Sequence, residues 1–314
     1  MIVVTGGAGF IGSNLVHALN ARGRRDILVV DDLTNGHKFR NLAHAQVADY
    51  VDHQEFKTTL CSSAAWPKAL EIIYHLGACS DTTEWNGRYM MDVNFTYSKA
   101  MLQGCETLGI PLVYASSAAV YGANALCAER VEHEHPLNVY GYSKLLFDQH
   151  VRHCLPRLKI PVTGLRYFNV YGPGETHKGR MASVVYHFNQ QLRDGGTVRL
   201  FAGSHGVGAG EQRRDFVYIE DVIAMTLWCG ESRTHQPILN CGTGSAATFN
   251  DVARAIIAWH GRGAIEYIPF PQDLVAAYQS QTCADLGALR AAGDTGSFRA
   301  VAAGVHQYLQ WLNR

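Results

Sequence analysis

Thr5-Gly6-Gly7-Ala8-Gly9-Phe10-Ile11-Gly12 is the stretch that decides the fold of this chain. A short β-branched run, Ile2 to Val4, precedes it, and Ser13 to Leu19 follows with apolar residues at helical spacing. The order is therefore strand, glycine turn and helix. Glycines allow the backbone to turn tightly and to approach a pyrophosphate, which then lies at the positive N-terminus of the helix. The stretch predicts a turn that binds a dinucleotide.

The next apolar run supports the same interpretation. Ile27 to Val30 predicts a second strand, which ends in Asp31 and Asp32 at the distance where a carboxylate meets a ribose hydroxyl. Asp31 favours a dinucleotide with a free 2′-hydroxyl, whereas Lys38 and Arg40 could neutralise a 2′-phosphate. The residues alone leave NAD and NADP both open.

Strands and helices then alternate along the chain. Runs near 47–50, 72–75 and 112–115 predict strands, and a helix is expected from about 89 to 108. This alternation predicts an α/β fold with a doubly wound, mostly parallel Rossmann sheet and a smaller mixed α/β substrate-binding domain. Ligands of such sheets bind at the carboxyl ends of the strands.

The length of 314 residues allows about two domains. We expect residues 1–168 to form the dinucleotide-binding Rossmann domain, with a later return to it near 215–245. Residues 169–314 are then mainly the substrate-binding domain.

The composition excludes several kinds of partner. Lys and Arg number 27 and Asp and Glu also 27, so there is no net field to recruit nucleic acid or an anionic membrane. A small-molecule partner fits better. Eight cysteines without a C-x-x-C pair are typical of reduced thiols. With no leader before Ile2 and no run of membrane-spanning length, we expect a soluble, cytoplasmic protein.

Tyr140 and Lys144 stand four residues apart in an apolar-periodic run, so they share one helical face. A phenol with a pKa near 10 is a poor base at neutral pH, and an ammonium one turn away can correct this. Tyr140 is therefore the candidate acid/base and Lys144 the group that tunes it. Tyr142 points to another side of the helix and should be structural.

Ser116 and Ser117 follow the strand at 112–115 directly. They are expected at the carboxyl edge of the sheet, near the helix that carries Tyr140. A hydroxyl there can hydrogen-bond a substrate alcohol and align it with the phenol, although a serine pair can also simply satisfy the amides of a turn.

The second half of the chain is less regular. A strand at 162–168 runs into Asn169, which begins a polar turn at the same sheet edge. Lys178 lies in a loop of small and polar residues, and Arg180 and His187 could reach a phosphate from there. Further on, Arg214 stands beside a flexible glycine-rich segment. It suits a diphosphate, and a surface salt-bridge cluster is nearly as good an interpretation.

The histidines do not indicate a metal site. His133 and His135 lie in a loop, and His150 and His153 lie on the helix after Tyr140. Neither pair shows a zinc-site pattern, so we expect no metal.

Three of these motifs together resemble the extended short-chain dehydrogenase/reductase superfamily: the glycine turn at 5–12, the segment from Ser117 to Gly122, and the pair Tyr140 and Lys144. Longer peptides, among them 77–85 and 177–184, resemble the ADP-L-glycero-D-manno-heptose-6-epimerase family within it. The resemblance covers nearly the whole chain. It implies a nucleotide-sugar substrate from lipopolysaccharide core biosynthesis, tightly held NADP with NAD possible, and a homo-oligomer, a pentamer.

The resemblance also implies which residues act. Tyr140, supported by Lys144, would move the proton of an alcohol that Ser117 holds, and Lys178 would serve as a second acid. The implied cofactor contacts are Gly6, Gly9, Phe10, Ile11, Gly12, Asp31, Asp32, Lys38, His53, His75, Leu76, Gly77, Ala78, Ser80, Val93, Lys144, Val170 and Lys178. The implied substrate contacts are Asn169, Arg180, His187, Phe201, Ser204, Arg214 and Tyr278.

Three cofactor-side positions depart from that family's pattern. Leu76 stands where the family has glutamate, Val93 lies in the place of the second residue of an Asp-Asn-Asn, and His53 replaces a lysine. The catalytic positions are intact.

Other functions remain open on the same motifs. A UDP-hexose 4-epimerase shares them. A 4,6-dehydratase would need an Asp-Glu pair after the strand-end hydroxyl, and here Ala118 and Ala119 follow Ser117. A non-catalytic dinucleotide-binding regulator would have no need of a tuned phenol such as Tyr140 beside Lys144.

Overall fold

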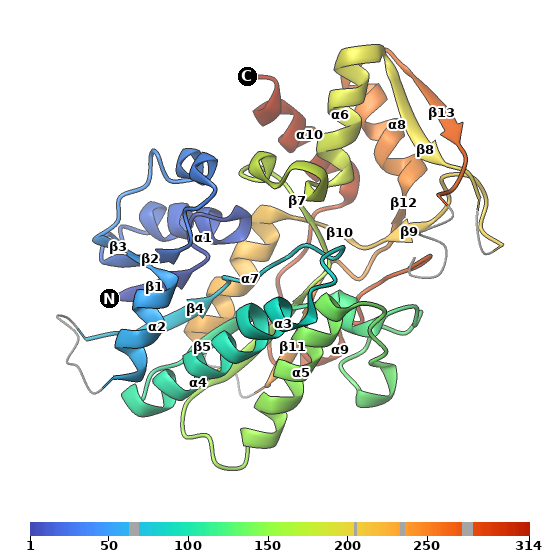
Figure 1. Cartoon of the computed structure of the whole chain (residues 1–314). Coiled ribbons are helices and arrows are strands. Elements are labelled where there is room, and N and C mark those ends of the chain that lie inside the picture. The colour runs from blue at the N-terminus through green and yellow to red at the C-terminus, as the bar shows by residue number, and fades with distance from the viewer. Residues whose placement is uncertain (63–68, 204–205, 233–235, 272–278) are drawn as a thin grey trace.

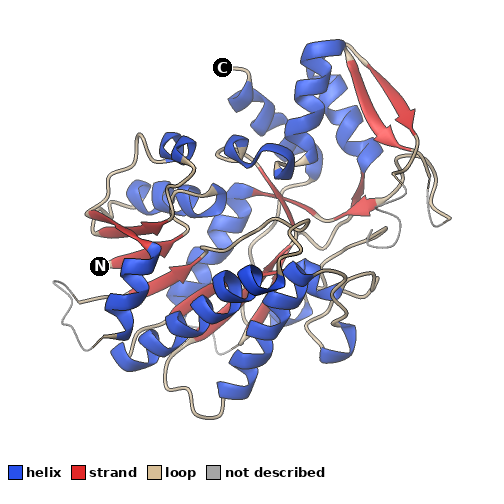
Figure 2. Cartoon of the chain, in the orientation of Figure 1, coloured by secondary structure: helices blue, strands red, loops and turns tan. Residues whose placement is uncertain are grey.

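The computed structural model describes residues 1–62, 69–203, 206–232, 236–271 and 279–314. At its centre is a seven-stranded sheet in the order β11-β6-β5-β4-β1-β2-β3 (Figures 1 and 2), and all its neighbours pair in parallel. The chain winds outward from β1 to β3 and then returns past β1 to β4, as in a Rossmann sheet. The predicted fold class is confirmed. The strands are β1 (Ile2–Thr5), β2 (Ile27–Asp31), β3 (Asp49–Asp52), β4 (Ile72–His75), β5 (Leu112–Ser117), β6 (Val162–Tyr167) and β11 (Ile238–Cys241).

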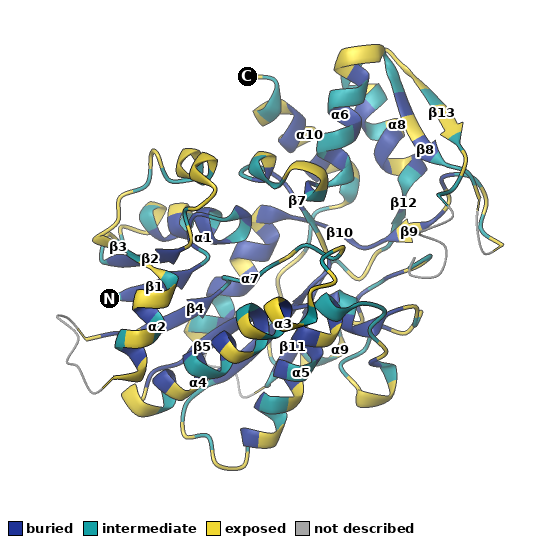
Figure 3. Ribbon diagram, viewed as in Figure 1, coloured by how far each residue is buried: buried dark blue, intermediate teal, exposed yellow. Residues whose placement is uncertain are grey.

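Helices cover both faces of this sheet. Successive residues of a strand point to opposite faces, so Ile2 and Val4 pack in one apolar cluster and Val3 packs in another. The first cluster includes α1 (Phe10–Ala21) and α7 (Ile219–Ser232). The second includes α2 (His53–Cys61), α4 (Tyr97–Leu108) and α5 (Val139–Cys154). Figure 3 shows the strands of the sheet as buried between these two layers, except for the edge strand β3, which is mostly exposed.

A smaller group of elements lies beyond the carboxyl edge of the sheet (Figure 1). There α6 (Val184–Gly195) packs on α8 (Phe249–His260), α10 (Val301–Leu312) packs on α8, and β8 (Thr197–Phe201) pairs in parallel with β13 (Ala264–Ile268). Short pairs connect this group to the sheet: β7 (Asn169–Tyr171) with β10 (Phe216–Tyr218), and β9 (Arg213–Arg214) with β12 (Ala247–Thr248). The remaining short helices are α3 (Gly87–Met90) and α9 (Gly287–Ala291).

Two predicted elements differ from the structure. The strand expected at 47–50 is β3, two residues later. The helix expected from 89 begins at Gly87 after the cap Asn86, and it contains a π-helical turn, Met91–Thr96. The side chain of Asn94 in that turn bonds both the amide and the carbonyl of Cys79, at 2.8 and 3.0 Å. Apolar periodicity does not signal such a turn, because it depends on this tertiary contact.

Elements that follow residue 168 also belong to the central sheet and its cover, namely α7 and β11. The division into 1–168, with a return near 215–245, and 169–314 stays a prediction. Among the described residues, no helix is long and apolar enough to cross a membrane.

Candidate active site

The turn between β1 and α1 is shaped by its glycines. Gly6 has a φ of +66°, a conformation that favours glycine. A Cβ on Gly12 would lie 2.1 Å from the carbonyl oxygen of Gly6, so any side chain there would force the turn apart. The helix starts after Gly9, which has no side chain to cover the first amides of α1. The turn is therefore a cradle whose helix N-terminus is suited to an anion.

Helix α5 brings Tyr140 and Lys144 to the end of β5. Its first turn is capped by Asn138, whose side chain accepts from the amide of Gly141 at 2.8 Å. Lys144 Nζ donates to the carbonyl of Ala115 at 3.0 Å. Tyr142, two residues from Tyr140, is 48% exposed. The helix thus presents the expected pair inward and the control tyrosine to solvent.

Burial sets the acidity of both groups. It raises the pKa of the Tyr140 phenol, and a hydrogen bond with Ser117 offsets part of the rise. It lowers the pKa of the Lys144 ammonium to about 8, against the opposing effect of Asp148 and Cys79. Lys144 can therefore change charge near neutral pH, which an exposed lysine cannot do.

Lys178 comes from a different element, the 3₁₀ segment Thr176–Met181. Its Nζ lies 5.5 Å from the centre of the Phe10 ring. Burial lowers the pKa of Lys178, and the charge of Glu175 opposes that fall. Lys178 is thus a second lysine that releases its proton more readily than an exposed lysine does, and it lies near Phe10 at the start of helix α1.

All four catalytic candidates line one cavity of about 970 Å³, which runs along the carboxyl edge of the sheet. Twenty of the residues named from the sequence share it: Gly6, Gly9, Phe10, Ile11, Gly12, Asp31, Asp32, Lys38, His53, Leu76, Gly77, Ala78, Ser80, Val93, Ser117, Tyr140, Lys144, Asn169, Val170 and Lys178. One long cavity thus joins the glycine turn to the Tyr140 and Lys178 side chains.

Five of the expected residues do not line this cavity in the described part of the chain. His75 is buried between the hydroxyls of Thr5 and Ser98, at 2.7 and 2.8 Å, and burial lowers its pKa to about 3. Its ring is therefore a neutral, structural group under the glycine turn. The other four are Arg180, His187, Phe201 and Arg214.

Those four have partners elsewhere in the described structure. Arg180 pairs with Asp81 at 2.9 Å and bonds Thr83 at 2.6 Å. His187 Nε2 lies 3.3 Å from the carbonyl of Arg180. Arg214 is buried over the ring of Phe249, which itself lines the cavity. Phe201 contacts Phe270.

Ser204 and Tyr278 lie outside the described residues, so their expected contacts with the substrate stay predictions.

Several lining residues were not expected from the sequence. Lys57 lines the cavity one helical turn after His53, and that spacing on α2 is the signal that could have revealed it. Others reach the cavity only through the tertiary fold: Cys79, Asp81, Tyr97, His177, Phe249 and Gln279. Among the described residues there is no group of three side chains that could hold a metal ion.

The model of the NAD dependent epimerase/dehydratase family matches residues 2–242. The chain belongs to this family. The ADP-L-glycero-D-manno-heptose-6-epimerase of Alkalilimnicola ehrlichii is 58% identical to it over 309 residues, which are 98% of this chain and 96% of that protein. This relative confirms the resemblance to heptose 6-epimerases that the sequence motifs carry.

Solved structures of the same fold agree. The ADP-L-glycero-D-manno-heptose-6-epimerase of Helicobacter pylori is 28% identical, with a TM-score of 0.86 over 99% of this chain and 96% of that one. A UDP-glucose 4-epimerase of Thermotoga maritima, solved with UDP-glucose, is 25% identical, with a TM-score of 0.82 over 99% of this chain and 98% of that one.

A member of the epimerase/dehydratase family uses a nicotinamide dinucleotide, and the cradle of Gly6 and Gly12 fits its pyrophosphate. Asp31, at the end of the second strand, would meet the adenosine end of such a cofactor, and it is 6% exposed. Its carboxylate accepts from the amide of Ala8 at 2.7 Å and forms an ion pair with Lys38, also at 2.7 Å. The second strand therefore ends in a paired acid and cation, and not in a lone carboxylate.

Proposed function

We propose that this chain inverts C6″ of ADP-D-glycero-D-manno-heptose to give ADP-L-glycero-D-manno-heptose. The observation that carries the proposal is that two candidate proton carriers, Tyr140 and Lys178, come from separate elements to one cavity. The name of the 58% identical relative supports the choice of sugar.

Two proton carriers are what this inversion needs. C6″ has no acidic neighbour in the resting sugar, so direct removal of its proton is implausible. A bound nicotinamide would accept the hydride of C6″ and later return it to the opposite face of the aldehyde. Once the aldehyde has turned over, its oxygen no longer faces the first acid, so a second acid is required.

Tyr140 is the first of the two. As a phenolate beside the ammonium of Lys144, it takes the proton of the C6″ hydroxyl while Ser117 holds the oxygen. Lys178 is the second: its ammonium gives a proton to the oxygen after the aldehyde has turned. After one turnover Tyr140 carries a proton and Lys178 lacks one, so a proton must pass from Tyr140 to Lys178, through solvent, before the next turnover in the same direction. The reverse reaction exchanges the two roles.

We further propose NADP as the cofactor. Lys38 lies at the cavity with Lys57 and His53, which gives the adenosine end several cationic or donor groups. Asp31 is already paired with Lys38 and with the Ala8 amide. A 2′-phosphate suits this arrangement better than a free hydroxyl that needs an unpaired carboxylate.

The proposal includes an assembly and a compartment. We propose a homo-oligomer, a pentamer, which analytical ultracentrifugation of the purified chain would test. The eight cysteines are free thiols, in keeping with a reducing cytoplasm.

Two measurements test the reaction. Mass spectrometry of the denatured protein identifies the released dinucleotide, and incubation with ADP-D-glycero-D-manno-heptose followed by separation of the epimers detects conversion. No conversion of this sugar, with conversion of a UDP-hexose, would select the 4-epimerase function that the Thermotoga maritima structure suggests.

The two-acid mechanism has its own test. Tyr140→Phe and Lys178→Met should each lose at least about a hundredfold in epimerisation, the usual contribution of a positioned acid or base. Each should still carry out one half-reaction on an aldehyde analogue, with opposite preference for the two faces. Full epimerase activity in Lys178→Met contradicts the mechanism.

A further inference from the structure

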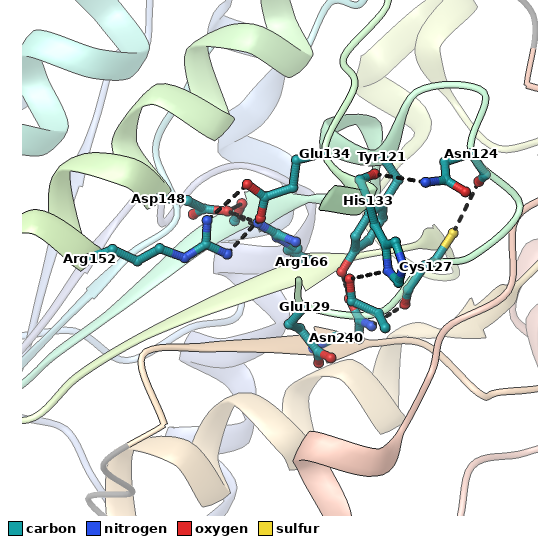
Figure 4. A network of polar contacts seen from close by, with 12 residues as sticks. Tyr121, Asn124, Cys127, Glu129, His133, Glu134, Asp148, Arg152, Arg166 and Asn240 are labelled. Atoms are coloured by element: carbon teal, nitrogen blue, oxygen red, sulfur yellow. Dashed lines mark hydrogen bonds and ion pairs between the residues drawn. The ribbon is translucent and has the colours of Figure 1, made fainter. Parts of the chain in front are cut away.

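A buried network of charges lies behind the candidate site. Arg166 on β6 is fully buried, and its guanidinium bonds the carboxylates of Asp148, at 2.9 Å, and Glu134. Arg152 meets Glu134 with two hydrogen bonds, at 2.8 and 2.6 Å. Figure 4 shows Arg166 between the two carboxylates, with Arg152 reaching Glu134. Two cations thus balance two anions in the interior.

One member of this network touches the strand that carries the catalytic serine. Asp148 Oδ2 accepts from the hydroxyl of Ser116 at 2.9 Å, and Oδ1 accepts from the hydroxyl of Tyr114 at 2.9 Å. Ser116 immediately precedes Ser117, and it is 3% exposed. The carboxylate therefore fixes the last residues of β5 against helix α5.

The same carboxylate stands one helical turn beyond Lys144 on α5. The strand residue between Tyr114 and Ser116 is Ala115, whose carbonyl accepts from Lys144 Nζ at 3.0 Å. Lys144 and Asp148 thus hold the same three residues of β5 from one helix face. Any shift of this contact would move Ser117 relative to Tyr140.

We propose that Asp148 and Ser116 are positioning residues of the active site: they hold the end of β5 in register with α5 and place a carboxylate on the same helix face as the ammonium of Lys144. This inference rests on the proposed epimerisation. The contacts that support it involve only the proton-transfer groups, so it does not depend on which sugar is bound.

In the described part of the chain, few charged groups near Lys144 can raise its pKa, so the charge of Asp148 matters. Among the described residues, the titratable groups around the ammonium are Tyr140 and Asp148 from its own helix, and Cys79 and His75 from β4 and the loop after it. Burial lowers the pKa of Lys144, and Asp148 is the first of the groups that oppose this. His75 is neutral at pH 7 because burial lowers its pKa to about 3. Asp148 is therefore the largest of the charges that favour the ammonium of Lys144.

Stability alone is a weak explanation for this network. Buried ion pairs can often be replaced by apolar residues without loss of stability, because desolvation offsets their attraction. If the carboxylate of Asp148 orients both the end of β5 and the side chain of Lys144, then its charge and its position are both required for activity. Two substitutions separate these requirements.

Asp148→Asn removes the charge and keeps the shape. The chain has only seven lysines, so labelling lysine Cε with ¹³C and assigning Lys144 through Lys144→Met makes its titration visible by NMR. We expect the midpoint of Lys144 to fall in Asp148→Asn relative to the wild type. An unchanged midpoint in the folded variant overturns the electrostatic part of the proposal.

Ser116→Ala keeps the charge and removes the hydrogen bond of Ser116 to Asp148, while the contacts of Tyr114 and Ala115 remain. Since a small misplacement of reacting groups costs up to about a hundredfold, we expect kcat to fall by about ten- to a hundredfold, with KM and the Lys144 midpoint unchanged. Thr163→Val is the matched control. Thr163 on β6 also buries a hydroxyl that donates a hydrogen bond, in this case to the carbonyl of Gln236, and it does not line the cavity. This control variant should have the wild-type kcat and the wild-type titration midpoint of Lys144.

Failure of the positioning role and failure of the proposed epimerase reaction give different results. A wild type that does not convert ADP-heptose contradicts the proposed reaction, while the NMR titration still decides the role of Asp148. If Asp148→Asn does not fold, Ser116→Ala decides: wild-type kcat in that variant overturns the positioning role.

Discussion

At the scale of the residue, burial changes what common side chains can do. Lysine is ordinarily charged across the physiological range, but the interior lowers the pKa of both Lys144 and Lys178. The phenol of Tyr140 shifts in the opposite direction, because its charged form is the anion. A buried phenol loses its proton less readily than one in water, so the proposed role of Tyr140 as a base depends on the ammonium of Lys144 to stabilise the phenolate.

The pKa of Lys144 predicts the alkaline limit of activity. The supporting group is the ammonium, so activity should be full below its pKa of about 8 and lost as the pH rises through that value. The measurement is kcat against pH, with product formation followed at saturating substrate. A rate that stays level to pH 10 contradicts the role of the ammonium.

Lys38 predicts the choice of dinucleotide. A hydrogen bond to a charged group contributes about 1.5–3 kcal/mol, so Lys38→Ala should weaken NADP binding by about ten- to a hundredfold. NAD binding should be unchanged or tighter, because Asp31 loses the partner that now occupies it. Titration of cofactor-free protein with each dinucleotide measures this.

Lys159→Ala is the control for that substitution, because Lys159 is exposed and does not line the cavity. If Lys38→Ala weakens the binding of NADP and of NAD equally, Lys38 does not contact a 2′-phosphate.

At the scale of the element, the site depends on where strands end and helices begin. β1 ends in a glycine turn, β2 ends in Asp31, and β5 ends in Ser117, all at one edge of a parallel sheet. Helix α5 starts at its cap Asn138, which sets the height of Tyr140 above that edge. These boundaries, more than the helix interiors, determine which side chains meet.

The glycine turn can be tested as a unit. Gly12→Ala places a Cβ 2.1 Å from the Gly6 carbonyl, so the turn must open and the cradle for the pyrophosphate should be lost. We expect the variant to purify without dinucleotide, as judged by mass spectrometry of the denatured protein, and with a lower Tm.

Gly195→Ala is the matched control, since a Cβ at this end of α6 meets nothing within 4 Å. It should retain cofactor and Tm. Full cofactor occupancy in Gly12→Ala would show that the close approach is not needed for binding.

Another contact joins two segments that line the cavity. Arg180, from the segment that carries Lys178, pairs with Asp81, from the loop after β4. The sequence suggested Arg180 as a phosphate contact, and the structure shows it engaged with the opposite wall. An exposed pair of this kind is weak, so an arriving diphosphate can compete for the guanidinium.

At the scale of the whole molecule, two layers of helices exclude water from the charged network behind the site. Burial alone would raise the pKa of Glu134, but the hydrogen bonds of Arg152 and the charge of Arg166 hold it below its usual 4.5. A carboxylate whose pKa is depressed on folding stabilises the protein above its unfolded pKa, and this contribution is lost as the pH falls.

Glu134→Gln should therefore cost about 2–3 kcal/mol at pH 7, the loss of hydrogen bonds to charged groups. The difference in Tm between variant and wild type should shrink as the pH falls below 4.5, because the unfolded wild type takes up a proton there, and it should vanish below the lower pKa of the folded state. Glu231→Gln removes an exposed pair with Arg22 and should change Tm little at any pH. A constant difference from pH 7 to pH 4 for Glu134→Gln contradicts the argument.

The sequence by itself determined the fold class and the chemistry at the sheet edge. The glycine turn, the strand-end Asp31 and Ser117, and the pair Tyr140 and Lys144 are local signals, because turn geometry and helical spacing involve neighbours in the chain. Twenty of the expected site residues accordingly line one cavity.

Only the tertiary structure decided the rest. His75 reads like a site residue but is enclosed between Thr5 and Ser98, and Asp148, which drew no notice in the sequence, touches the strand end beside Ser117. Burial and long-range contacts are properties of the packed sheet, since they depend on residues tens of positions apart. They set the pKa of each lysine and the register of α5 on β5, which no local pattern encodes.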